Sequence, residues 1–377
     1  MKCPTVEIVE ADGAFEALDR WLRGHGFFVP GGENLIADVY LGYGLSATIR
    51  RHHTPPPPEP CRLPLIAASV RVPVHDVKYD NRGEPGGGPA ASVGPWTQTW
   101  SGPDYARAVR RVRAAIERGD VYQVNLVQHL SAPFSGDPLS LAARLERLNP
   151  HNPEPYRGNG WTVVSASPEL FLARRGRRVW TRPIKGTRPA GGGQELARST
   201  KDAAEHVMIV DLERNDLARV CEPGSVRWPE LMTTRSLAGV EHMVSTVEGT
   251  LRKDVGLPEL LASTFPGGSI TGAPKIAAVD VIAEIEPVGR GASMGALGWI
   301  QGNGDLDLAL TIRTFAVADG RVHLWVGGGV VWDSDPLAEI EESWVKADPL
   351  LDAIGAPRGV RPAHASGHGA EPGIGLE

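Results

Sequence analysis

The sequence predicts a protein of the α+β class. Segments with helical spacing of apolar residues and segments with strand character both recur along the 377 residues, but they do not alternate strictly. Hydrophobic residues make up 41% of the chain and charged residues 22%, as in ordinary globular domains. The length allows one large core or two ordinary ones. We therefore expect an α+β protein rather than a strictly alternating α/β protein.

Helices and strands can be assigned in chain order. Apolar residues at helical spacing, with Gly119 behind them as a helix-terminating residue, predict a helix over residues 104–118. Further helices are expected near residues 139–148, 194–218, 257–264, 274–285 and 336–354. Strands are expected at residues 121–130, 161–166, 170–174, 226–228, 294–301, 308–317 and 321–331. Strands within residues 1–78 are expected to join the same sheets.

Stretches rich in proline and glycine interrupt this pattern. Residues 54–60 form a proline-rich break, and residues 79–96 have the composition of a linker. Residues 358–377 have a composition typical of disorder. The regular pattern of helices and strands therefore begins after the linker and ends before the tail.

Charge and cysteine content argue against several classes of protein. The net charge is −6, so no overall basic field indicates a nucleic-acid partner. Three widely spaced cysteines give neither a disulfide framework nor a zinc site, and they fit a reducing compartment. No run of about 18 apolar residues predicts a membrane span, and the N-terminus lacks the apolar region of a signal peptide. We expect a cytoplasmic protein that binds neither nucleic acid nor a membrane.

The predicted helix at residues 336–354 has two distinct faces. Asp335 suits its N-cap and Pro336 its first turn. Its apolar stripe is expected to comprise Leu337, Ile340, Trp344, Ala347 and Leu351. A second stripe carries Glu339, Glu342 and Lys346. In isolation this stripe is compatible with a solvated face that holds a Glu–Lys pair.

The helix near residues 194–218 repeats the acid pair. Asp202 and Glu205 lie three residues apart, where an exposed pair of Glu205 with a neighbouring lysine is again an alternative. Two such pairs on separate helices can converge on a hard cation. Oxygen ligands without histidine or cysteine clusters favour Mg²⁺ over Zn²⁺.

Three glycine-rich or proline-rich segments have the character of binding loops. FPGGSITGAPK (265–275) runs into a helix, where backbone N–H groups favour anions, although a tight turn is the alternative. VGGGVV (326–331) lies within a strand pattern, where three glycines permit close approach to the backbone. Arg313 lies on the expected strand 308–317 and can grip a carboxylate. TRPIKGTRPAG (181–191) holds Lys185 in a rigid setting of proline and glycine.

In sequence these motifs resemble those of the chorismate-utilising enzymes, which include anthranilate, aminodeoxychorismate, isochorismate and salicylate synthases. The resemblance covers residues 104–354 in order and is weak over residues 1–100. It rests on GDVYQVNL (119–126), SPELF (167–171), TRPIKGTRPAG, STKDAAEHVMIVDLERNDLARVCEPGSV (199–226), HMVSTVEG (242–249), FPGGSITGAPK, LTIRTF (310–315) and GGGVVWDSDPLAEIEESWVK (327–346).

The resemblance implies that the substrate is chorismate, which has two carboxylates and a hydroxyl leaving group, bound through Mg²⁺. By position, Glu205 and Glu342 would be the metal ligands, with Asp202 and Glu339 as supporting acids. Glu169 would be the general acid that protonates the departing 4-hydroxyl, and His242 would lie beside the reacting ring. Without the resemblance, both would be taken for surface residues. The substrate would be held by Gly186, Thr187, Thr271, Arg313, Gly327, Gly328, Gly329 and Lys346.

Two positions indicate the branch of the family. Members that add water resemble one another in a lysine base where this chain has Gln123, and glutamine cannot deprotonate water. Anthranilate synthases, which add ammonia at ring C2, usually have a small residue in place of Lys185. The motif PIKGT is that of the aminodeoxychorismate branch, in which a neutral lysine amine adds at C2 and ammonia then adds at C4. Arg182 and Arg188 are expected to help keep Lys185 neutral.

The resemblance also implies partners and architecture. No cysteine nucleophile in a glycine-rich elbow is found, so ammonia is expected from a separate glutamine amidotransferase subunit, for the synthesis of 4-aminobenzoate and folate or of aminated antibiotics. Anthranilate synthase and a non-catalytic chorismate-binding regulator are the alternatives. The fold would be two large β-sheets packed roughly orthogonally with helices outside, as in anthranilate synthase component I. Residues 1–100 would be a shortened N-terminal part of that fold, and residues 101–354 the catalytic domain.

Overall fold

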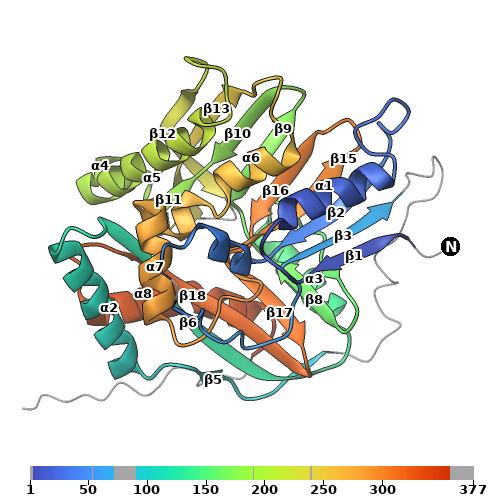
Figure 1. Ribbon diagram of the computed structural model, residues 1–377. Helices are drawn as coiled ribbons and strands as arrows, with labels where there is room; N and C mark the ends of the chain where they lie inside the picture. Colours follow the sequence, from blue (N-terminus) through green and yellow to red (C-terminus); the bar gives the residue numbers. More distant parts are fainter. Residues whose placement is uncertain (1–2, 53, 72–90, 190, 238–239, 357–377) are drawn as a thin grey trace, which may run out of the picture.

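The computed structural model describes residues 3–52, 54–71, 91–189, 191–237 and 240–356. Most of the linker predicted at 79–96 and the tail predicted at 358–377 lie outside these residues. Two β-sheets, both antiparallel in the pairings described, form the protein together with eight α-helices in the described ranges, which confirms the α+β class. Figure 1 shows one sheet above the other, with strands that run in clearly different directions.

The larger sheet has ten strands. In spatial order they are β1 (Thr5–Ile8), β3 (Ile66–Arg71), β2 (Ile36–Leu41), β15 (Ala296–Gln301), β16 (Leu306–Leu310), β9 (Leu170–Arg175), β10 (Arg178–Arg182), β13 (Val240–Thr250) and β11 (Ile184–Pro189), while β12 (Arg227–Leu237) also pairs with β13. The pairing of β2 with β15 joins the N-terminal strands to the rest of this sheet.

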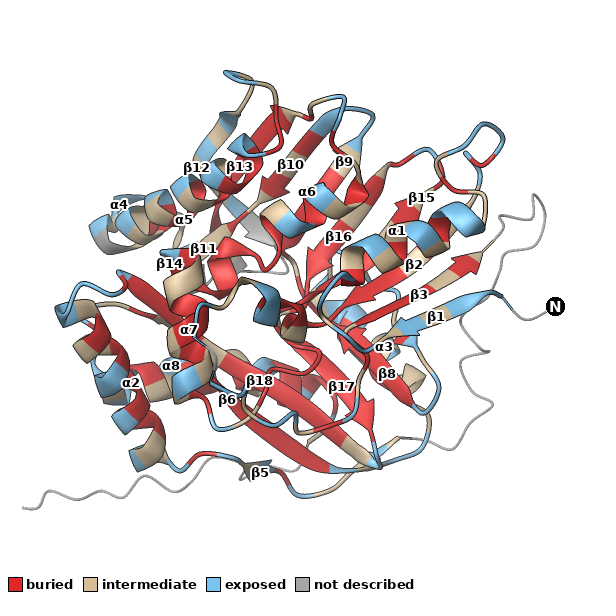
Figure 2. Ribbon diagram, in the orientation of Figure 1, coloured by how far each residue is buried: buried red, intermediate tan, exposed pale blue. Residues whose placement is uncertain are grey.

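The smaller sheet has eight strands around the long strand β6. In order they are β14 (Gly272–Ala273), β6 (Gln123–Ser135), β18 (Arg321–Val330), β17 (Thr314–Ala318), β8 (Trp161–Ser165) and β7 (Tyr156–Arg157), with β4 (Ser92–Val93) and β5 (Thr97–Gln98) also on β6. Ten consecutive residues of β6 are buried, so this strand runs through the core (Figure 2).

The helices pack against the two sheets. They are α1 (Ala14–Gly24), α2 (Gly102–Glu117), α3 (Leu139–Leu145), α4 (Gly193–Arg198), α5 (Thr200–Ala218), α6 (Leu257–Thr264), α7 (Lys275–Ile285) and α8 (Pro336–Ala353), with short 3-10 turns η1 (Tyr43–Ile49), η2 (Glu146–Leu148) and η3 (Gly268–Ile270). Helix α5 packs on β13, and α8 packs on β18 (Figure 1). These two helices carry the acid pairs predicted from the sequence.

The strand expected at 308–317 is wrong as a single element. It divides into β16, in the larger sheet, and β17, in the smaller one. The break falls at Arg313, whose φ of 50° lies in the left-handed region that a side chain rarely adopts. Arg313 therefore lies on the crossing between the two sheets and not within a strand.

Two expected helices also differ from the prediction. The segment 194–218 is two helices, because Ser199 adopts an extended conformation and its hydroxyl caps α5 by accepting from Asp202 N. Helix α3 ends at Leu145 and continues only as a 3-10 turn. The helix at 257–264 has the predicted bounds, and Gly119 follows α2 with a positive φ as expected.

The predicted apolar stripe of α8 is partly wrong. Asp335 caps the helix as expected, and Trp344, Ala347 and Leu351 are buried. Leu337, however, is 72% exposed, whereas Glu339 is only 5% exposed. The first turn of α8 thus turns an acid inward and an apolar residue outward, so the reading of a fully solvated acidic face fails for Glu339.

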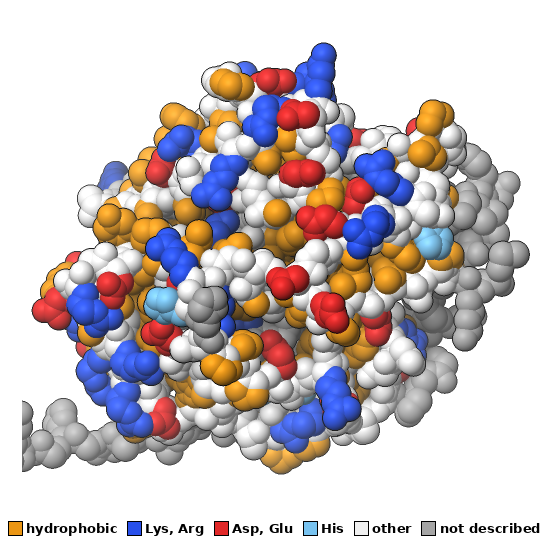
Figure 3. Space-filling view, viewed as in Figure 1, with side chains coloured by type: hydrophobic (Ala, Val, Ile, Leu, Met, Phe, Trp, Pro, Cys, Tyr) orange, Lys and Arg blue, Asp and Glu red, His pale blue; other side chains and the backbone are white. Residues whose placement is uncertain are grey.

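Charged side chains of both signs lie on the surface of the protein. Figure 3 shows acidic and basic side chains interspersed on the face that it displays, without a dominant basic patch. Within the described ranges, no helix has both the length and the apolar character needed to span a bilayer.

Candidate active site

Lys185 lies where β11 bends away from regular pairing with β13. Lys185 pairs with Met243 and Thr187 with His242, and the register shifts between them at Gly186. Gly186 has a φ of 66°, and a Cβ there would lie 2.4 Å from Leu196 Cδ1. Glycine is therefore required at this bulge by both conformation and space. The side chain of Thr187 is outside what the structure describes.

The Lys185 side chain is partly buried and lies near several carboxylates. Its Nζ donates to the carbonyl oxygen of Ser269 at 3.2 Å. Burial lowers the pKa of Lys185, while Glu169, Glu205 and Glu342 oppose that shift electrostatically and Lys346 adds to it. Lys185 thus lies within the field of both acid-bearing helices and of the expected general acid.

The two arginines that flank Lys185 in the sequence, Arg182 and Arg188, make contacts with other residues. Arg188 forms ion pairs with Glu195 at 3.0 Å and with Asp202 at 2.9 Å. Arg182 Nε donates to Thr246 Oγ1 at 3.4 Å. The cation that lowers the pKa of Lys185 is Lys346, from α8, a role that the sequence did not indicate.

Glu169 is buried beside Lys185, only 4% exposed. Ser269 Oγ donates to its Oε1 at 2.7 Å, and the amide of Ile184 donates to the same oxygen at 3.4 Å. Burial raises the pKa of Glu169, against these hydrogen bonds and the charges of Lys185 and Arg313. A carboxyl with a raised pKa retains its proton toward neutral pH, as a general acid must.

His242 and Arg313 approach the same region from the larger sheet and from the crossing between the sheets. His242 is 1% exposed, and its Nδ1 lies 3.4 Å from the carbonyl oxygen of Gly186. Burial lowers the pKa of His242, and the charge of Arg313 lowers it further, so the ring is neutral at pH 7. Burial also lowers the pKa of Arg313, against the attraction of Glu169.

The acids of α8 face the glycines of β18. A Cβ placed on Gly328 would lie 3.0 Å from Glu342 Oε1, 3.2 Å from Lys346 Nζ and 3.5 Å from Glu339 Oε2. Lys346 Nζ donates to Glu342 Oε1 at 2.7 Å and to the carbonyl oxygen of Gly327 at 2.9 Å. The Glu–Lys pair expected on this face is therefore present, but it points at the backbone of β18.

The other two glycines meet β6 instead. A Cβ on Gly327 would lie 1.9 Å from the carbonyl oxygen of Leu126, and one on Gly329 would lie 1.8 Å from Gln123 Nε2. Close approach to a neighbouring strand thus requires glycine at Gly327, while Gly328 opens toward α8.

The acids fit a magnesium ion in number and chemistry. Glu205 and Glu342 come from different helices, and both act on the charge of Lys185. Among the residues that the structure describes, no group of three or more potential ligands is close enough to hold a metal without further partners. Mg²⁺ is commonly bound by one or two carboxylates, with water and substrate oxygens as the remaining ligands. Two carboxylates from separate helices are compatible with that pattern.

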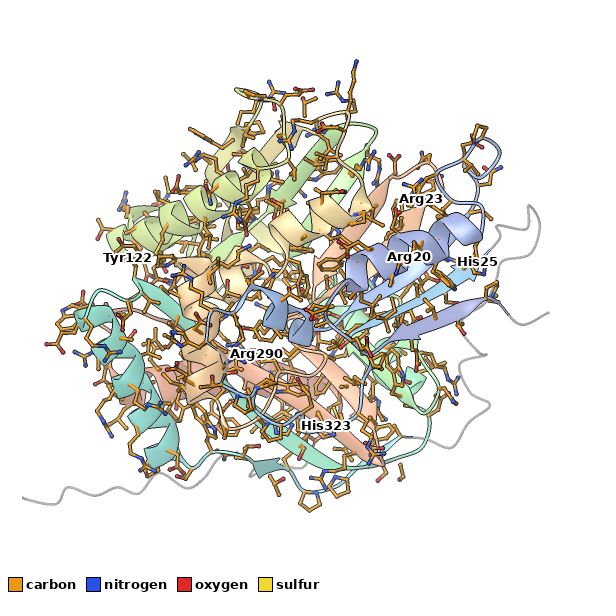
Figure 4. All side chains as sticks on the ribbon, viewed as in Figure 1. Arg20, Arg23, His25, Tyr122, Arg290 and His323 are labelled. Carbon is orange, nitrogen blue, oxygen red and sulfur yellow. The ribbon has the colours of Figure 1, made fainter. Side chains whose placement is uncertain are left out.

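A buried ion pair between Arg290 and Glu286 fixes the position of the glycine-rich loop 265–275. Arg290 Nη1 donates to the carbonyl oxygen of Ile270 at 2.9 Å, and its Nη2 donates to that of Asn125 at 2.6 Å. Arg290 also pairs with Glu286 at 2.8 Å, and Glu286 Oε1 accepts from the amide of Val127 at 3.0 Å. Figure 4 shows Arg290 in the interior of the molecule. This pair, invisible to sequence periodicity, fixes the loop against β6.

Thr271 supports the loop from within. Its side chain is fully buried, and its Oγ1 donates to the carbonyl oxygen of Gly267 at 2.9 Å. Its own carbonyl oxygen accepts from the amide of Asn125 at 2.8 Å. The hydroxyl of Thr271 is thus engaged within the loop.

The residues predicted from the sequence therefore come together from distant parts of the chain. Lys185, Glu169, Glu205, Glu342 and Lys346 share one electrostatic neighbourhood. Asp202, in contrast, is tied to Arg188. Sequence reasoning did not single out Ser269, which contacts both Lys185 and Glu169, although it lies in the loop chosen as an anion site.

Comparisons with known proteins agree with this arrangement. The family model described as chorismate binding enzyme matches residues 66–352. The chain is 43% identical over 270 residues to anthranilate synthase component 1 of Streptomyces coelicolor, which covers 69% of the chain and 53% of that protein. It is 42% identical over 268 residues to aminodeoxychorismate synthase component 1 of Klebsiella aerogenes, covering 69% and 59% respectively.

The chain thus spans little more than half the length of the curated relatives that it matches. Its fold is similar to that of anthranilate synthase component I from Streptococcus pneumoniae, with a TM-score of 0.77 at 24% identity over 93% of this chain and 92% of the other. This likeness confirms the expected fold.

Proposed function

The chain belongs to the chorismate-binding enzymes, and on that premise we propose that it converts chorismate and ammonia to 4-amino-4-deoxychorismate, as an aminodeoxychorismate synthase component I. The observation that carries the proposal is the position of Lys185. Its amine lies beside the buried Glu169, in the field of Glu205 and Glu342, and burial lowers its pKa. A lysine in such a setting is suited to act as a nucleophile.

Substrate binding follows from the cationic and backbone groups around this amine. Arg313 would pair with a carboxylate of chorismate, because a guanidinium binds a carboxylate through two parallel hydrogen bonds. Backbone groups of Gly186 and Thr187 and of the glycines Gly327 to Gly329 would hold the remaining oxygens. Lys346, held by Glu342, would add positive charge at that side, and Thr271 would shape the loop beneath the substrate.

We propose Mg²⁺ as the cofactor. Glu205 and Glu342 would be its protein ligands, supported by Asp202 and Glu339 through water or hydrogen bonds. When bound, the ion would neutralise the ring carboxylate of chorismate and orient the ring. The two carboxylates alone make a weak site, so binding of metal and of substrate should depend on each other.

In the reaction, Lys185 and Glu169 would act together on opposite ends of the substrate diene. Neutral Lys185 Nζ adds at ring C2, and the double bond shifts as the C4 hydroxyl leaves with the proton of Glu169. Ammonia then adds at C4 and expels the lysine amine from C2. His242, neutral at pH 7 because burial and Arg313 lower its pKa, would pack beside the ring without competing for that proton.

Ammonia would come from a separate glutamine amidotransferase subunit. Burial raises the pKa of the Cys61 thiol to about 12 and that of Cys221 to about 11. Neither thiol is then a thiolate at neutral pH, as a glutaminase nucleophile must be. The proposed product is an intermediate on the way to 4-aminobenzoate.

Anthranilate synthesis is the second candidate, because the relatives at about 40% identity carry both names. The proposals diverge at Lys185, which in our proposal would occupy the space in which ammonia would attack C2. Incubation with chorismate, Mg²⁺ and ammonium salts, followed by mass analysis, separates them. We expect a 4-amino-4-deoxychorismate product, and direct formation of fluorescent anthranilate would refute the assignment.

The Lys185→Ala variant tests the covalent step in the same assay. We expect it to lose 4-amino product while it still binds chorismate, since Arg313 and the glycine backbone are intact. Full activity of this variant would exclude the lysine adduct. Chelation by EDTA should abolish turnover, and Mg²⁺ should restore it. Unchanged activity in EDTA would remove the magnesium proposal, and chorismate left intact by the wild type would favour a binding role.

A further inference from the structure

A second layer of buried acids lies behind Glu169. Glu213 and Asp216 occupy one face of α5 and are 6% and 4% exposed. Thr181 Oγ1, from β10, donates to Glu213 Oε2 at 3.2 Å. Asp216 forms a buried ion pair with Lys275, at the start of α7. None of these groups has a part in the proposed reaction, yet burying carboxyls is costly unless they are paired or protonated.

Glu213 and Glu169 flank the same turn of the glycine-rich loop. A Cβ on Gly268 would lie 3.4 Å from Glu213 Cγ, so Glu213 packs directly on Gly268. The next residue, Ser269, donates to Glu169 Oε1. Burial raises the pKa of Glu213 well above its ordinary value, and the nearby charges of Glu169 and Asp216 raise it further, while Thr181 and Lys275 oppose this. Burial therefore favours the protonated form of Glu213.

Asp216, one turn along α5 from Glu213, lines a cavity. This cavity of about 220 Å³ is also lined by Lys275, Ser263 and Arg219, among others. Its lining contains none of the residues proposed to contact chorismate. Glu213 thus lies between Gly268, beside the Glu169 contact, and the acid that borders this separate cavity.

The proposed reaction, on which this inference rests, consumes a proton at Glu169. In the first step the C4–O bond breaks, and the leaving oxygen takes the Glu169 proton and departs as water. In the second step neutral ammonia forms the C4–N bond and the C2–N bond to Lys185 breaks. The product nitrogen becomes an ammonium and the lysine leaves as a neutral amine, so no proton returns to Glu169. One proton per turnover must come from solvent.

We infer that Glu213 restores this proton, passing it from the Asp216 side of α5 to the Glu169 carboxylate. Glu169 is only 4% exposed, and Ser269 and Ile184 both donate to its Oε1, so an internal donor can reach this carboxylate while the substrate side is filled. Glu213 donates its proton to Glu169 and takes another from water in the cavity beside Asp216. Glu213 is therefore a positioning residue that acts through Glu169 and does not touch the substrate.

Single-turnover and steady-state kinetics of Glu213→Gln test this role. Glutamine keeps the shape of the side chain and can accept from Thr181. Because Glu169 begins protonated, the first turnover of chorismate should proceed at the wild-type rate. Later turnovers should slow on the order of tenfold or more, the size of a lost proton transfer. A purely structural role would slow the first turnover equally, which would overturn the inference, as would unchanged later turnovers.

A matched control lies on the same helix. Asp211→Asn removes a carboxylate that is 67% exposed and paired with Arg214, and it should change neither phase. Infrared spectroscopy gives a second, activity-independent readout. The wild type should show a protonated-carboxyl band at pH 7 that Glu213→Gln weakens and Asp211→Asn retains. If the wild type lacks that band, the relay is wrong even where chorismate is consumed, whereas failure of the wild type to consume chorismate counts against the proposed function alone.

Discussion

A single added methyl group should separate the binding glycine of β18 from the structural one. In Gly328→Ala the new Cβ would lie 3.0 Å from Glu342 Oε1 and 3.2 Å from Lys346 Nζ, both at the ends of flexible side chains. These ends can move by a few tenths of an ångström, so we expect the free energy of unfolding to change by less than about 1 kcal/mol. Both side chains are partly exposed, so their own ion pair contributes little to stability, but in our proposal they act directly on the metal and the substrate. The KM for chorismate should therefore rise on the order of tenfold or more.

Gly327→Ala is the matched comparison one residue away. Its Cβ would lie 1.9 Å from the Leu126 carbonyl oxygen and 2.7 Å from Val127 Cα, which are backbone atoms that cannot rotate aside. Overpacking of this kind costs about 1–3 kcal/mol, so this variant should lose stability in urea unfolding. Chorismate kinetics of both variants complete the test. A Gly328→Ala enzyme with wild-type KM, or a Gly327→Ala protein as stable as the wild type, would refute this account of β18.

Three further outcomes are expected. Ser269→Ala removes a donor that stabilises the Glu169 carboxylate, so the pKa of Glu169 should rise and the alkaline limb of the pH–rate profile should move to higher pH; a shift to lower pH would contradict this. Arg313→Lys should raise KM for chorismate on the order of tenfold with little change in Tm, because lysine cannot make the two-point contact; an unchanged KM would remove Arg313 from the binding site. Burial lowers the pKa of His129 to about 3 and of His323 to about 4, so the unfolded chain binds more protons below pH 6.5 and stability is lost on acidification. A double His→Gln variant at these positions should therefore show a shallower fall in unfolding free energy between pH 7 and 5, by about 1 kcal/mol per pH unit for each histidine; equal slopes would disprove it.

The sequence predicted elements well where local patterns decide them. Helix α6 has the expected bounds and α8 begins at the expected cap, Asp335, while apolar spacing placed α2 within two residues of its observed bounds, Gly102–Glu117. It failed where long-range packing decides. The run 308–317 reads as one strand, and only the two separate sheets force the turn at Arg313. The inward rotation of Glu339 at the start of α8 likewise has no local signal.

The site shows the same division. The sequence motifs identified candidate site residues whose type is distinctive, namely the charged Lys185 and Glu169 and the glycines of β18. They did not single out Ser269 or Arg290, whose contacts with Lys185 and with Asn125 span 84 and 165 positions in sequence. They also misjudged Arg188, which a short loop places near Lys185 in sequence but which pairs with acids on α4 and α5.

Helix α8 has a consequence for synthesis of the protein. It is the last helix of the described chain, and it supplies Glu342 and Lys346 to a site whose other members begin with Glu169. During translation Glu169, Lys185 and Glu205 therefore leave the ribosome well before Glu342 and Lys346 do. A nascent chain that ends before α8 would present the carboxylates of α5 and the β18 glycines to water without their counterparts. The ability to recognise substrate should thus appear abruptly, when the last helix emerges and docks.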